Sequence, residues 1–566
     1  MSDQHAVVSG RTFEPPGKGP WELETTHFVR PVTAMGQAAM EAGFVRGFSA
    51  STARYGVLLS HLQPKFVQSF GYMQPVPVGA PEGAMGPPPK PVLQLVSRLH
   101  PEMRRRHRTA AKAMAEKQWR TDLKQWDEVD KPAAITKHRA IGAIDVRALD
   151  DAALADHVDV CAEHYGNMIA LHHTYTITAI LPVGDFLAGA TAWTGAPVSE
   201  LMGLLRGRSE ISRGFAAEEL GLAADALAGS PSARTVLESA KPADAILAEL
   251  AAHPEVGKSV SAYLDAVRWR CVGYDLGDKA AGELPEALAE TLRAALNGAP
   301  SEVTDDDTAL QVLREKVPAD QRADFDERLA EVRLIYRIRD ERGVFGDGSA
   351  VGLARRALLE VGRRLVERGA VTKAEHAVEL DAAEARALLL GNGGPDAAEL
   401  ADRFTWRTSM TTSDAPPFLN AMPAPPPPAD WLPAPARRTA AAMGMALGQL
   451  FVPADKPNTA TVLNGLTVNS GVYEGIARVI DSTDNFDRIK QGDVLVTQAT
   501  SPYFNVVLPM LGAIVTDHGG QLCHAAIVAR EYGIPGVVGT REATSTIPDG
   551  ARVRVDGTTG EVTLLD

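Results

Sequence analysis

The sequence has few cysteines and no long uninterrupted hydrophobic run. Its three cysteines, Cys161, Cys271 and Cys523, show no metal-binding spacing, and so small a number fits a reducing compartment. No uninterrupted apolar run is long enough to cross a bilayer, and the N-terminus lacks the apolar core of a signal peptide. We therefore expect a cytoplasmic protein that has no metal site and does not enter a membrane.

Positively charged residues are fewer than negatively charged ones. The 57 Lys and Arg residues are outnumbered by 71 Asp and Glu residues, which gives a formal net charge of -14 at pH 7. This balance argues against nucleic acid or a membrane surface as a partner. A hydrophobic content of 45% is ordinary for a globular protein, and a length of 566 residues favours several domains over one.

Residues 516–539 carry the clearest functional pattern. The preceding apolar run, residues 512–515, is typical of a buried strand, and after two glycines His524 opens a short helical run that ends at Gly533. Backbone amides and the positive end of the helix dipole gather at such a junction and favour a phosphate. Since an imidazole is nucleophilic near neutral pH, the pattern predicts a histidine that accepts a phosphoryl group. A helix cap or a surface histidine is the simpler alternative.

This stretch resembles the swivelling phosphohistidine domain of the phosphoenolpyruvate-utilising enzymes, which include phosphoenolpyruvate synthase, pyruvate phosphate dikinase and rifampicin phosphotransferase. The run Leu-Cys-His-Ala-Ala-Ile-Val-Ala-Arg-Glu carries the resemblance, together with residues 492–497, 500–502, 549–550 and 555–557. The resemblance implies that His524 is phosphorylated during turnover. The residues predicted to cradle the phosphoryl group around it are Thr516, Gly519, Gly520 and Cys523.

We predict a multidomain protein in which a mostly α-helical acceptor-binding region, residues 1–413, precedes a C-terminal α/β swivelling phosphohistidine domain, residues 439–566. The first 100 residues are rich in Pro and Gly and are expected to be irregular, with short helices only. Between the two regions, residues 414–438 form a Pro-rich linker. Such a stiff, extended tether would let one domain travel while it stays attached.

Two histidines stand out near the end of an apolar helical run in the first region. His172 or His173 is a candidate general base for an acceptor hydroxyl, and Tyr175 is a candidate substrate-binding residue. The alternative is that these side chains cap or pack against the helix. A basic run at residues 103–108 is interpreted as the solvated start of a helix rather than as an anion site.

Residues 333–342 are rich in arginine, whose planar fork suits phosphate oxygens. They resemble the helical linker that precedes the swivelling domain in the same superfamily, where an Arg-acid-x-x-Lys segment meets the phosphohistidine. The Lys position falls on Gly343, or on Arg342 with a one-residue shift, which leaves the exact phosphate contacts open. On a helix, Arg333, Arg337 and Glu341 share one face by their spacing of four, and an ordinary surface ion pair is the alternative for Arg339. The candidates are Arg339 and Arg337 for the phosphate, and Asp340 and Glu341 for the substrate.

The sequence has no Gly-x4-Gly-Lys-Ser/Thr loop and no segment resembling an ATP-grasp domain, and it ends at Asp566 before any phosphoenolpyruvate-binding barrel. This arrangement resembles the larger subunit of phenylphosphate synthase and of related alkylphenol-phosphorylating enzymes. The resemblance implies that a separate ATP-grasp subunit binds ATP and Mg²⁺, and that His524 passes a phosphoryl group to a phenol such as p-cresol. A bulky antibiotic-type hydroxyl, or a carrier protein without a small-molecule acceptor, are the alternatives.

Overall fold

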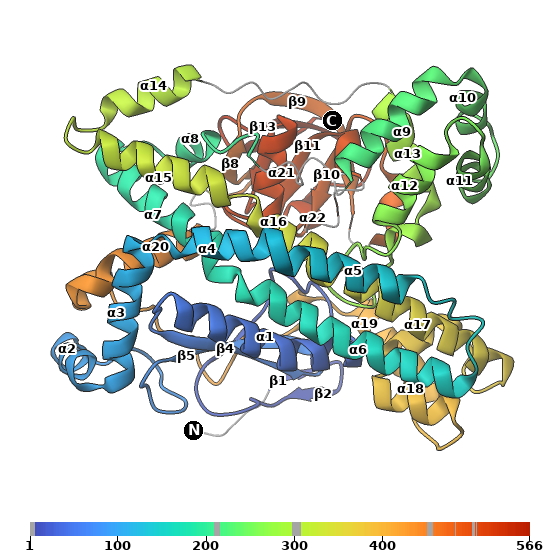
Figure 1. The fold of residues 1–566 in the computed structure, drawn as a ribbon, viewed down its shortest axis with the longest axis horizontal. Helices are drawn as coiled ribbons and strands as arrows, with labels where there is room; N and C mark the ends of the chain where they lie inside the picture. Colours follow the sequence, from blue (N-terminus) through green and yellow to red (C-terminus); the bar gives the residue numbers. More distant parts are fainter. Residues whose placement is uncertain are drawn as a thin grey trace. The chain divides into compact units, whose positions relative to one another are not determined.

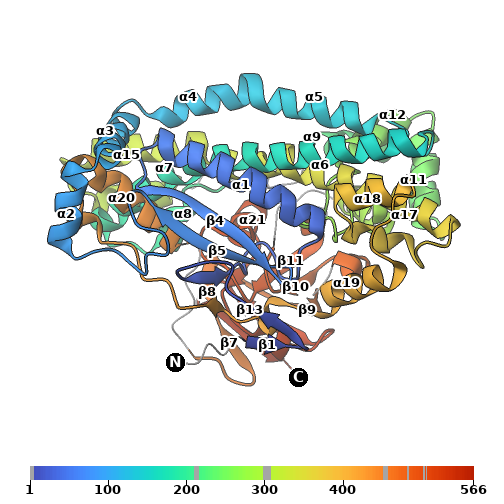
Figure 2. The ribbon, with the colours of Figure 1, turned by 90° about the horizontal axis from the view of Figure 1, so that it is seen from below.

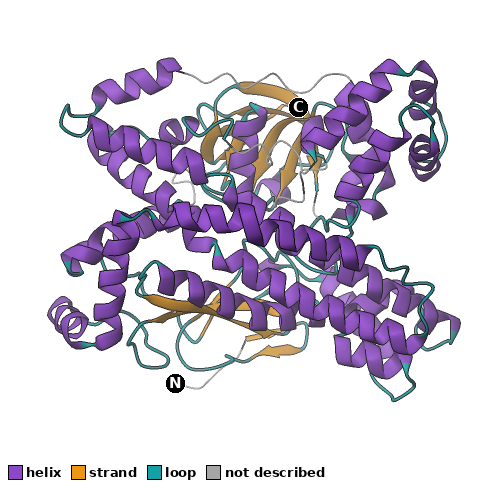
Figure 3. Cartoon of the chain, in the orientation of Figure 1, coloured by secondary structure: helices purple, strands orange, loops and turns teal. Residues whose placement is uncertain are grey.

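The computed structural model describes residues 6–208, 216–296, 307–449, 457–480, 483–500, 504 and 507–565. By internal contacts the chain forms two compact units, each built from several segments. Unit 1 consists of Met1–Leu181, Tyr274–Gly277 and Phe345–Gly444, and unit 2 consists of Pro182–Gly273, Asp278–Val344 and Met445–Asp566. Helices predominate, and the strands gather in small groups (Figure 3). The predicted boundaries at residues 413 and 438 stay a prediction.

Unit 1 is organised around a long helix on a small antiparallel sheet. Helix α1 (Ala34–Arg54) lies along α6 (Asp151–Thr174) and covers the hairpin of β4 (Leu59–Val67) and β5 (Phe70–Pro77) (Figures 1 and 2). The sheet order is β4-β5-β3-β6. The other elements of this unit are β1 (Ala6–Val8), β2 (Arg11–Phe13), β3 (Trp21–Leu23), β6 (Phe418–Leu419), α2 (Lys90–Leu99), α3 (Pro101–Ala115), α4 (Gln118–Gln125), α5 (Lys131–Gly142), α17 (Gly348–Glu367), α18 (Ala382–Leu389) and α19 (Ala397–Ser409).

The prediction that the first 100 residues are irregular is wrong, because α1 spans 21 residues and is followed by a long hairpin. Glycine normally weakens a helix, and the sequence pattern therefore argued against one. Here Gly43 and Gly47 lie where α1 meets α6. A Cβ atom at Gly43 would come within 2.4 Å of the carbonyl oxygen of Gly166, and one at Gly47 within 2.0 Å of that of Ala170. The glycines therefore permit a close helix–helix approach.

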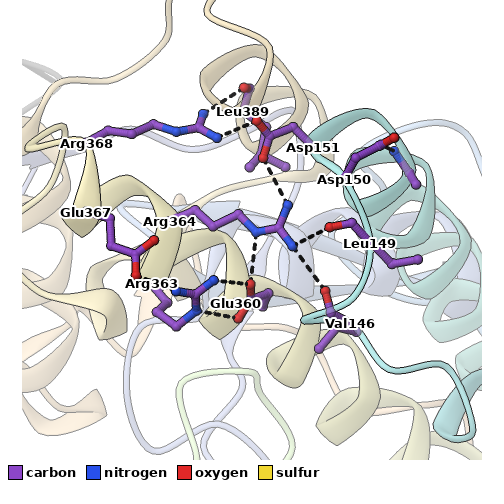
Figure 4. Close-up of polar contacts among 11 residues, drawn as sticks. Val146, Leu149, Asp150, Asp151, Glu360, Arg363, Arg364, Glu367, Arg368 and Leu389 are labelled. Carbon is purple, nitrogen blue, oxygen red and sulfur yellow. Dashed lines mark hydrogen bonds and ion pairs between the residues drawn. The ribbon is translucent and has the colours of Figure 1, made fainter.

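An arginine network fastens α17 to the start of α6 (Figure 4). Arg364, nearly buried, pairs with Glu360 on its own helix and reaches Asp151 across to α6 at 3.0 Å. Its guanidinium also donates to the carbonyl oxygens of Val146, at 3.2 Å, and Leu149, at 2.7 Å. The Arg364 guanidinium thus contacts two carboxylates and two carbonyl oxygens. These contacts compensate its positive charge for the loss of water on burial.

Two histidines are buried where α5 meets α6. His164 contacts His138 through its Nε2 atom at 2.9 Å, and His138 contacts the carbonyl oxygen of Phe345 at 3.0 Å. Burial lowers the pKa of His164 to about 3, with the neighbouring His138 adding to the effect. The folded protein therefore keeps this imidazole neutral where the unfolded chain protonates it.

Stability is expected to fall with acidification because of this histidine. A depressed histidine pKa makes the unfolded chain bind more protons, so the free energy of unfolding drops as pH falls from 6.5 toward about 3. The slope is expected to approach about 1.4 kcal/mol per pH unit. Denaturant unfolding at several pH values should show a shallower slope for His164→Gln. An unchanged slope would contradict the assignment.

One helical stretch, residues 151–194, is long and apolar enough to pass a test for a membrane span; it comprises α6 and α7 (Thr176–Thr194). Of its apolar 18-residue window, 72% is buried inside the protein. A core helix of a soluble protein has the same properties, and the packing of α6 against α1 and α17 explains the apolar composition.

Unit 2 contains an eight-stranded mixed sheet in the order β7-β14-β13-β9-β10-β11-β12-β8. Strands β9 to β12 form its parallel centre. All residues of β10 are buried, as expected of a strand that is covered on both faces. The alternation of apolar runs and glycine turns in the sequence predicts strands at residues 475–480, 493–497, 512–516, 536–539, 552–555 and 562–565, and all six are confirmed. Strands β7 and β8 were not predicted. The strands are β7 (Val462–Asn464), β8 (Leu466–Asn469), β9 (Val472–Val479), β10 (Asp493–Thr497), β11 (Leu511–Thr516), β12 (Gly536–Val538), β13 (Arg552–Asp556) and β14 (Glu561–Leu565).

The helices of unit 2 come from two distant parts of the chain. Those of the C-terminal part are α21 (His524–Tyr532), which packs on β8, β11 and β12, and α22 (Ala543–Thr546). The earlier ones are α8 (Val198–Gly203), α9 (Ala217–Gly229), α10 (Pro231–Leu237), α11 (Ala243–Ala252), α12 (Gly257–Val267), α13 (Pro285–Leu296), α14 (Asp307–Lys316), α15 (Arg322–Ile335) and α16 (Ile338–Arg342). Helix α20 (Ala434–Gly448) runs from unit 1 into unit 2.

Candidate functional site

His524 is the first residue of α21, with Cys523 at the N-cap, as the sequence predicts. The turn between β11 and this helix contains Gly519 at φ +116°, a conformation that side chains other than glycine rarely adopt. The helix ends at Gly533, whose φ of +67° gives the expected left-handed C-cap. His524 therefore lies where the amides of the first helical turn meet a sharp glycine turn.

The turn before His524 is fastened to β8 by a buried arginine. Arg530 donates to the carbonyl oxygen of Val468 at 3.2 Å and to that of Gln521 at 2.5 Å. The side-chain amide of Gln521 in turn donates to the carbonyl oxygen of Thr467 at 2.7 Å. Arg530 is one turn and a half along α21 from His524, so the same helix that carries the histidine also holds its loop.

The other side of the turn is held by hydroxyl and carboxylate groups. Thr516, fully buried, donates from its hydroxyl to the carbonyl oxygen of His518 at 2.8 Å. Asp517 accepts from the backbone amide of Thr544 at 3.0 Å and from the Thr544 hydroxyl. Thr516 was predicted to cradle a phosphate. In the structure its hydroxyl shapes the turn through the bond to His518, and a direct phosphate role stays a prediction.

Helix α16 brings a carboxylate to the histidine within unit 2. Asp340 Oδ1 lies 3.9 Å from His524 Nδ1, and both side chains are nearly buried, with 4% and 6% exposed. Burial dominates at Cys523 and raises the pKa of its thiol. The amides of Ala525 and Ala526 and the charge of the nearby Arg339 act in the opposite direction and favour the thiolate. Two of the predicted arginine-segment residues, Arg339 and Asp340, are thus gathered at the phosphohistidine candidate.

Arg337 and Glu341, two further candidates of the arginine segment, pair with each other. Arg337 Nη1 donates to both carboxylate oxygens of Glu341, at 2.7 and 2.8 Å, in the predicted spacing of four residues. The segment is not one continuous helix, because α15 ends at Ile335 and α16 begins at Ile338. Gly343 follows α16 and supplies no side chain where relatives are expected to carry a lysine.

The histidine pair of the first region lies in unit 1. His172 Nδ1 is 2.9 Å from Asp347 Oδ1, and His173 Nδ1 is 3.2 Å from the Thr176 hydroxyl. Tyr175 is fully buried and donates from its hydroxyl to Asp130 at 2.5 Å. The assignment of these three residues to catalysis and substrate binding stays a prediction. Asp347 was missed, because no local pattern links residues 175 positions apart.

Two further sequence observations concern metals and the upstream motif. Within the described residues, no group of three or more His, Cys, Asp or Glu side chains is arranged to hold a metal ion. Ser501 and Pro502, which contributed to the resemblance, lie outside the described residues.

The basic run at residues 103–108 lies inside α3, where Arg105 and Arg106 both pair with Glu102. The run therefore belongs to a helix, as interpreted, but it is not solvated throughout, because Arg106 and His107 are buried.

Gly519 should not tolerate a side chain. A Cβ atom there would come within 2.7 Å of Cys523 Sγ, in addition to the strain of its positive φ. We expect Gly519→Ala to destabilise unit 2 by about 1–3 kcal/mol and to lower phosphoryl uptake by His524. Adding Cys523→Ala removes the sulfur and should restore part of the loss in thermal unfolding. Equal melting temperatures for wild type and Gly519→Ala would refute the close contact.

Comparison with known proteins extends this local picture. Residues 489–560 match the family described as PEP-utilising enzyme, mobile domain. The chain is 42% identical over 111 residues to uncharacterized phosphotransferase YvkC of Bacillus subtilis (strain 168), covering 20% of this chain and 13% of that protein. It is 46% identical over 101 residues to a probable phosphoenolpyruvate synthase of Archaeoglobus fulgidus, covering 18% of this chain and 13% of that protein.

One relative matches a longer stretch. A rifampicin phosphotransferase of Streptomyces sp is 31% identical over 341 residues, which cover 57% of this chain and 36% of that protein. Among solved structures, the holo-form of Thermococcus kodakaraensis aconitase X covers 19% of this chain and 98% of that chain at 21% identity, with a TM-score of 0.16. So low a score supports no conclusion about a shared fold. The chain spans 36% or less of the length of these three curated relatives.

These matches confirm the resemblance drawn from the sequence. The chain carries the mobile domain of the PEP-utilising enzymes, and through it is related to phosphotransferases and phosphoenolpyruvate synthases. The Streptomyces match is longer than residues 489–560 can account for, so the relationship to a rifampicin phosphotransferase also includes residues outside that segment.

Proposed function

We propose that this chain is the phosphohistidine-carrying component of an ATP-dependent phosphotransferase. The observation that carries the proposal is His524 at the start of α21, after a glycine turn and beside Asp340 and Arg339. In the proposed reaction a separate ATP-grasp subunit, which holds Mg-ATP, transfers the β-phosphoryl group to His524 and the overall products are AMP and phosphate. Backbone amides at the helix start and the Arg339 guanidinium offset charge on the phosphoryl oxygens.

The proposed acceptor is the hydroxyl of a small phenol, such as phenol or p-cresol, and the proposed location is the cytoplasm. The phenolic oxygen attacks phosphorus in line as the bond to the His524 nitrogen breaks. A phenol has a pKa near that of tyrosine, about 10, so its proton is removed more easily than that of an aliphatic alcohol. This lowers the demand on a general base such as His172 or His173.

A second candidate acceptor is a bulky antibiotic-type hydroxyl. The Streptomyces rifampicin phosphotransferase favours it, because that match includes residues beyond the mobile domain. A third reading, a phosphohistidine carrier that modifies no small molecule, is weakened by the same match. The three differ in what removes the phosphoryl group from His524.

The test is an acceptor competition with the loaded protein. Chain phosphorylated at His524 should lose its phosphoryl group on addition of p-cresol, with cresyl phosphate formed in equal amount, and should keep it in the presence of rifampicin. Transfer to rifampicin instead would establish the antibiotic-type reaction. If no hydroxyl compound accelerates the loss above hydrolysis, the carrier reading replaces both.

A further inference from the structure

A buried carboxylate orients one of the two adjacent histidines of unit 1. His172 lies on α6, and its Nδ1 atom is 2.9 Å from Oδ1 of Asp347, which is the N-cap residue of α17. Asp347 is nearly buried, with 6% of its side chain exposed, whereas His172 is 16% exposed. Since a carboxylate accepts, Nδ1 carries the hydrogen in this contact and the lone pair of the neutral imidazole lies on Nε2. This is the orientation that a general base requires.

An aromatic surface adjoins this pair. The His172 and His173 rings have centroids 4.7 Å apart, and Phe44 lies behind His173 at 4.0 Å. Phe44 stacks in turn on Phe48, with ring centroids 5.5 Å apart and an angle of 12° between the planes. Both phenylalanines are buried on α1, whereas His173 is partly exposed. The histidine is thus held from behind by two buried rings next to the oriented imidazole.

We propose that this cluster is the acceptor site for the phosphoryl group: His172 is the general base, Asp347 is its positioning residue, and the ring of a phenolic acceptor packs against His173. The inference rests on the proposed function and adds to it the residues of the acceptor step. Edge-to-face and offset contacts with an aromatic ring favour a flat acceptor over an aliphatic alcohol of the same size.

The chemistry of the step balances without a further reactant. The hydroxyl proton of the phenol passes to Nε2 of His172, and the phenolic oxygen forms a bond to phosphorus. The bond between phosphorus and the His524 imidazole breaks, and its electron pair stays on that nitrogen. His172 then releases the proton to water. Asp347 stabilises the imidazolium of His172 while it carries the proton, but is not itself protonated.

The test separates loading of His524 from transfer to the acceptor. The full chain is phosphorylated with potassium phosphoramidate, a small phosphoryl donor to imidazoles, so that no partner subunit is needed. Transfer is then followed with phenol and with the more acidic 4-nitrophenol. The variants are His172→Gln, Asp347→Asn and His173→Asn, and the matched control is Asp145→Asn, an exposed carboxylate of unit 1 that accepts from the Arg147 amide.

All variants are expected to load His524 like the wild type. With phenol, His172→Gln should lower the transfer rate about 100-fold and Asp347→Asn at least about tenfold, while Asp145→Asn has no effect. Both losses should shrink with 4-nitrophenol, because a more acidic hydroxyl needs less help from a base. His173→Asn should raise the KM for phenol several-fold and leave kcat within about twofold.

Two results would overturn the proposal. The first is transfer to phenol at the wild-type rate by loaded His172→Gln and Asp347→Asn protein. The second is a transfer rate that falls by the same factor with phenol and with 4-nitrophenol, which would indicate a structural role. Wild-type protein that cannot be loaded at His524, or that transfers to neither phenol, would refute the proposed function instead, and the acceptor site with it. Circular dichroism melting of each variant checks that the fold is retained.

Discussion

Replacing His524 with asparagine is expected to abolish phosphoryl uptake and phenol phosphorylation, with a loss of at least about 10⁴-fold. The imidazole is the only nucleophile at the start of α21 that the account uses, and an amide cannot form the phosphoramidate bond. Asparagine suits the first turn of a helix, so the turn should keep its shape. The measurement is acid-labile, base-stable label on the purified protein after incubation with labelled donor.

The matched control for this variant is His518→Asn, in the same turn. The backbone of His518 takes part in the turn, with its amide donating to the carbonyl oxygen of Gln498 and its carbonyl accepting from Thr516. These bonds survive a side-chain change. We expect His518→Asn to retain label within about twofold of the wild type. If both histidines were needed equally, the assignment of a single phosphorylated residue would be wrong.

Replacing Arg530 with methionine should have the next largest effect. The change leaves the carbonyl oxygens of Val468 and Gln521 without their guanidinium donor in a buried environment. We expect a loss of about 3 kcal/mol in the free energy of unfolding. Uptake by His524 should fall as well, because the turn that ends at the histidine is no longer held on β8.

The control for the arginine is Arg552→Met. Arg552 lies on β13 in the same unit, is mostly exposed and pairs with Glu474 at 2.9 Å. An exposed pair contributes little, so the expected change is below about 1 kcal/mol. Chemical denaturation of both variants, with uptake measured on the folded protein, makes the comparison. Equal stability of Arg530→Met and Arg552→Met would show that the buried network does not hold the turn.

The C-terminal part of the fold could be read from the sequence because its signals are local. Apolar runs between glycines predict the strands around β10, and the run from His524 to Gly533 contains both ends of α21. The helix α1 could not be read in this way. The glycines of α1 have low helix propensity, so the local sequence predicts an interruption there. Their role is to let α6 pack closely, and that contact is known only from the structure.

In the candidate site, too, the sequence predicts the features that are local, whereas contacts between distant segments are known only from the structure. His524 and its turn are contiguous, so their chemistry was predicted. The spacing of four also placed Arg337 and Glu341 on one helical face, where the structure shows them paired. The approach of Asp340 to His524 depends on the packing of α16 and α21, which are nearly two hundred residues apart in the chain. The pairing of His172 with Asp347 is equally remote in sequence, which is why the carboxylate had to come from the structure.

The central claim is that this chain carries, on His524, a phosphoryl group that a separate subunit takes from ATP. The most direct test incubates the chain with ATP labelled at either the β- or the γ-phosphorus, with and without a co-encoded ATP-grasp protein, for wild type and His524→Asn. We expect label from the β-position only, only in the presence of the partner, and none on His524→Asn. Label without the partner, label that survives in His524→Asn, or no label under any condition would contradict it.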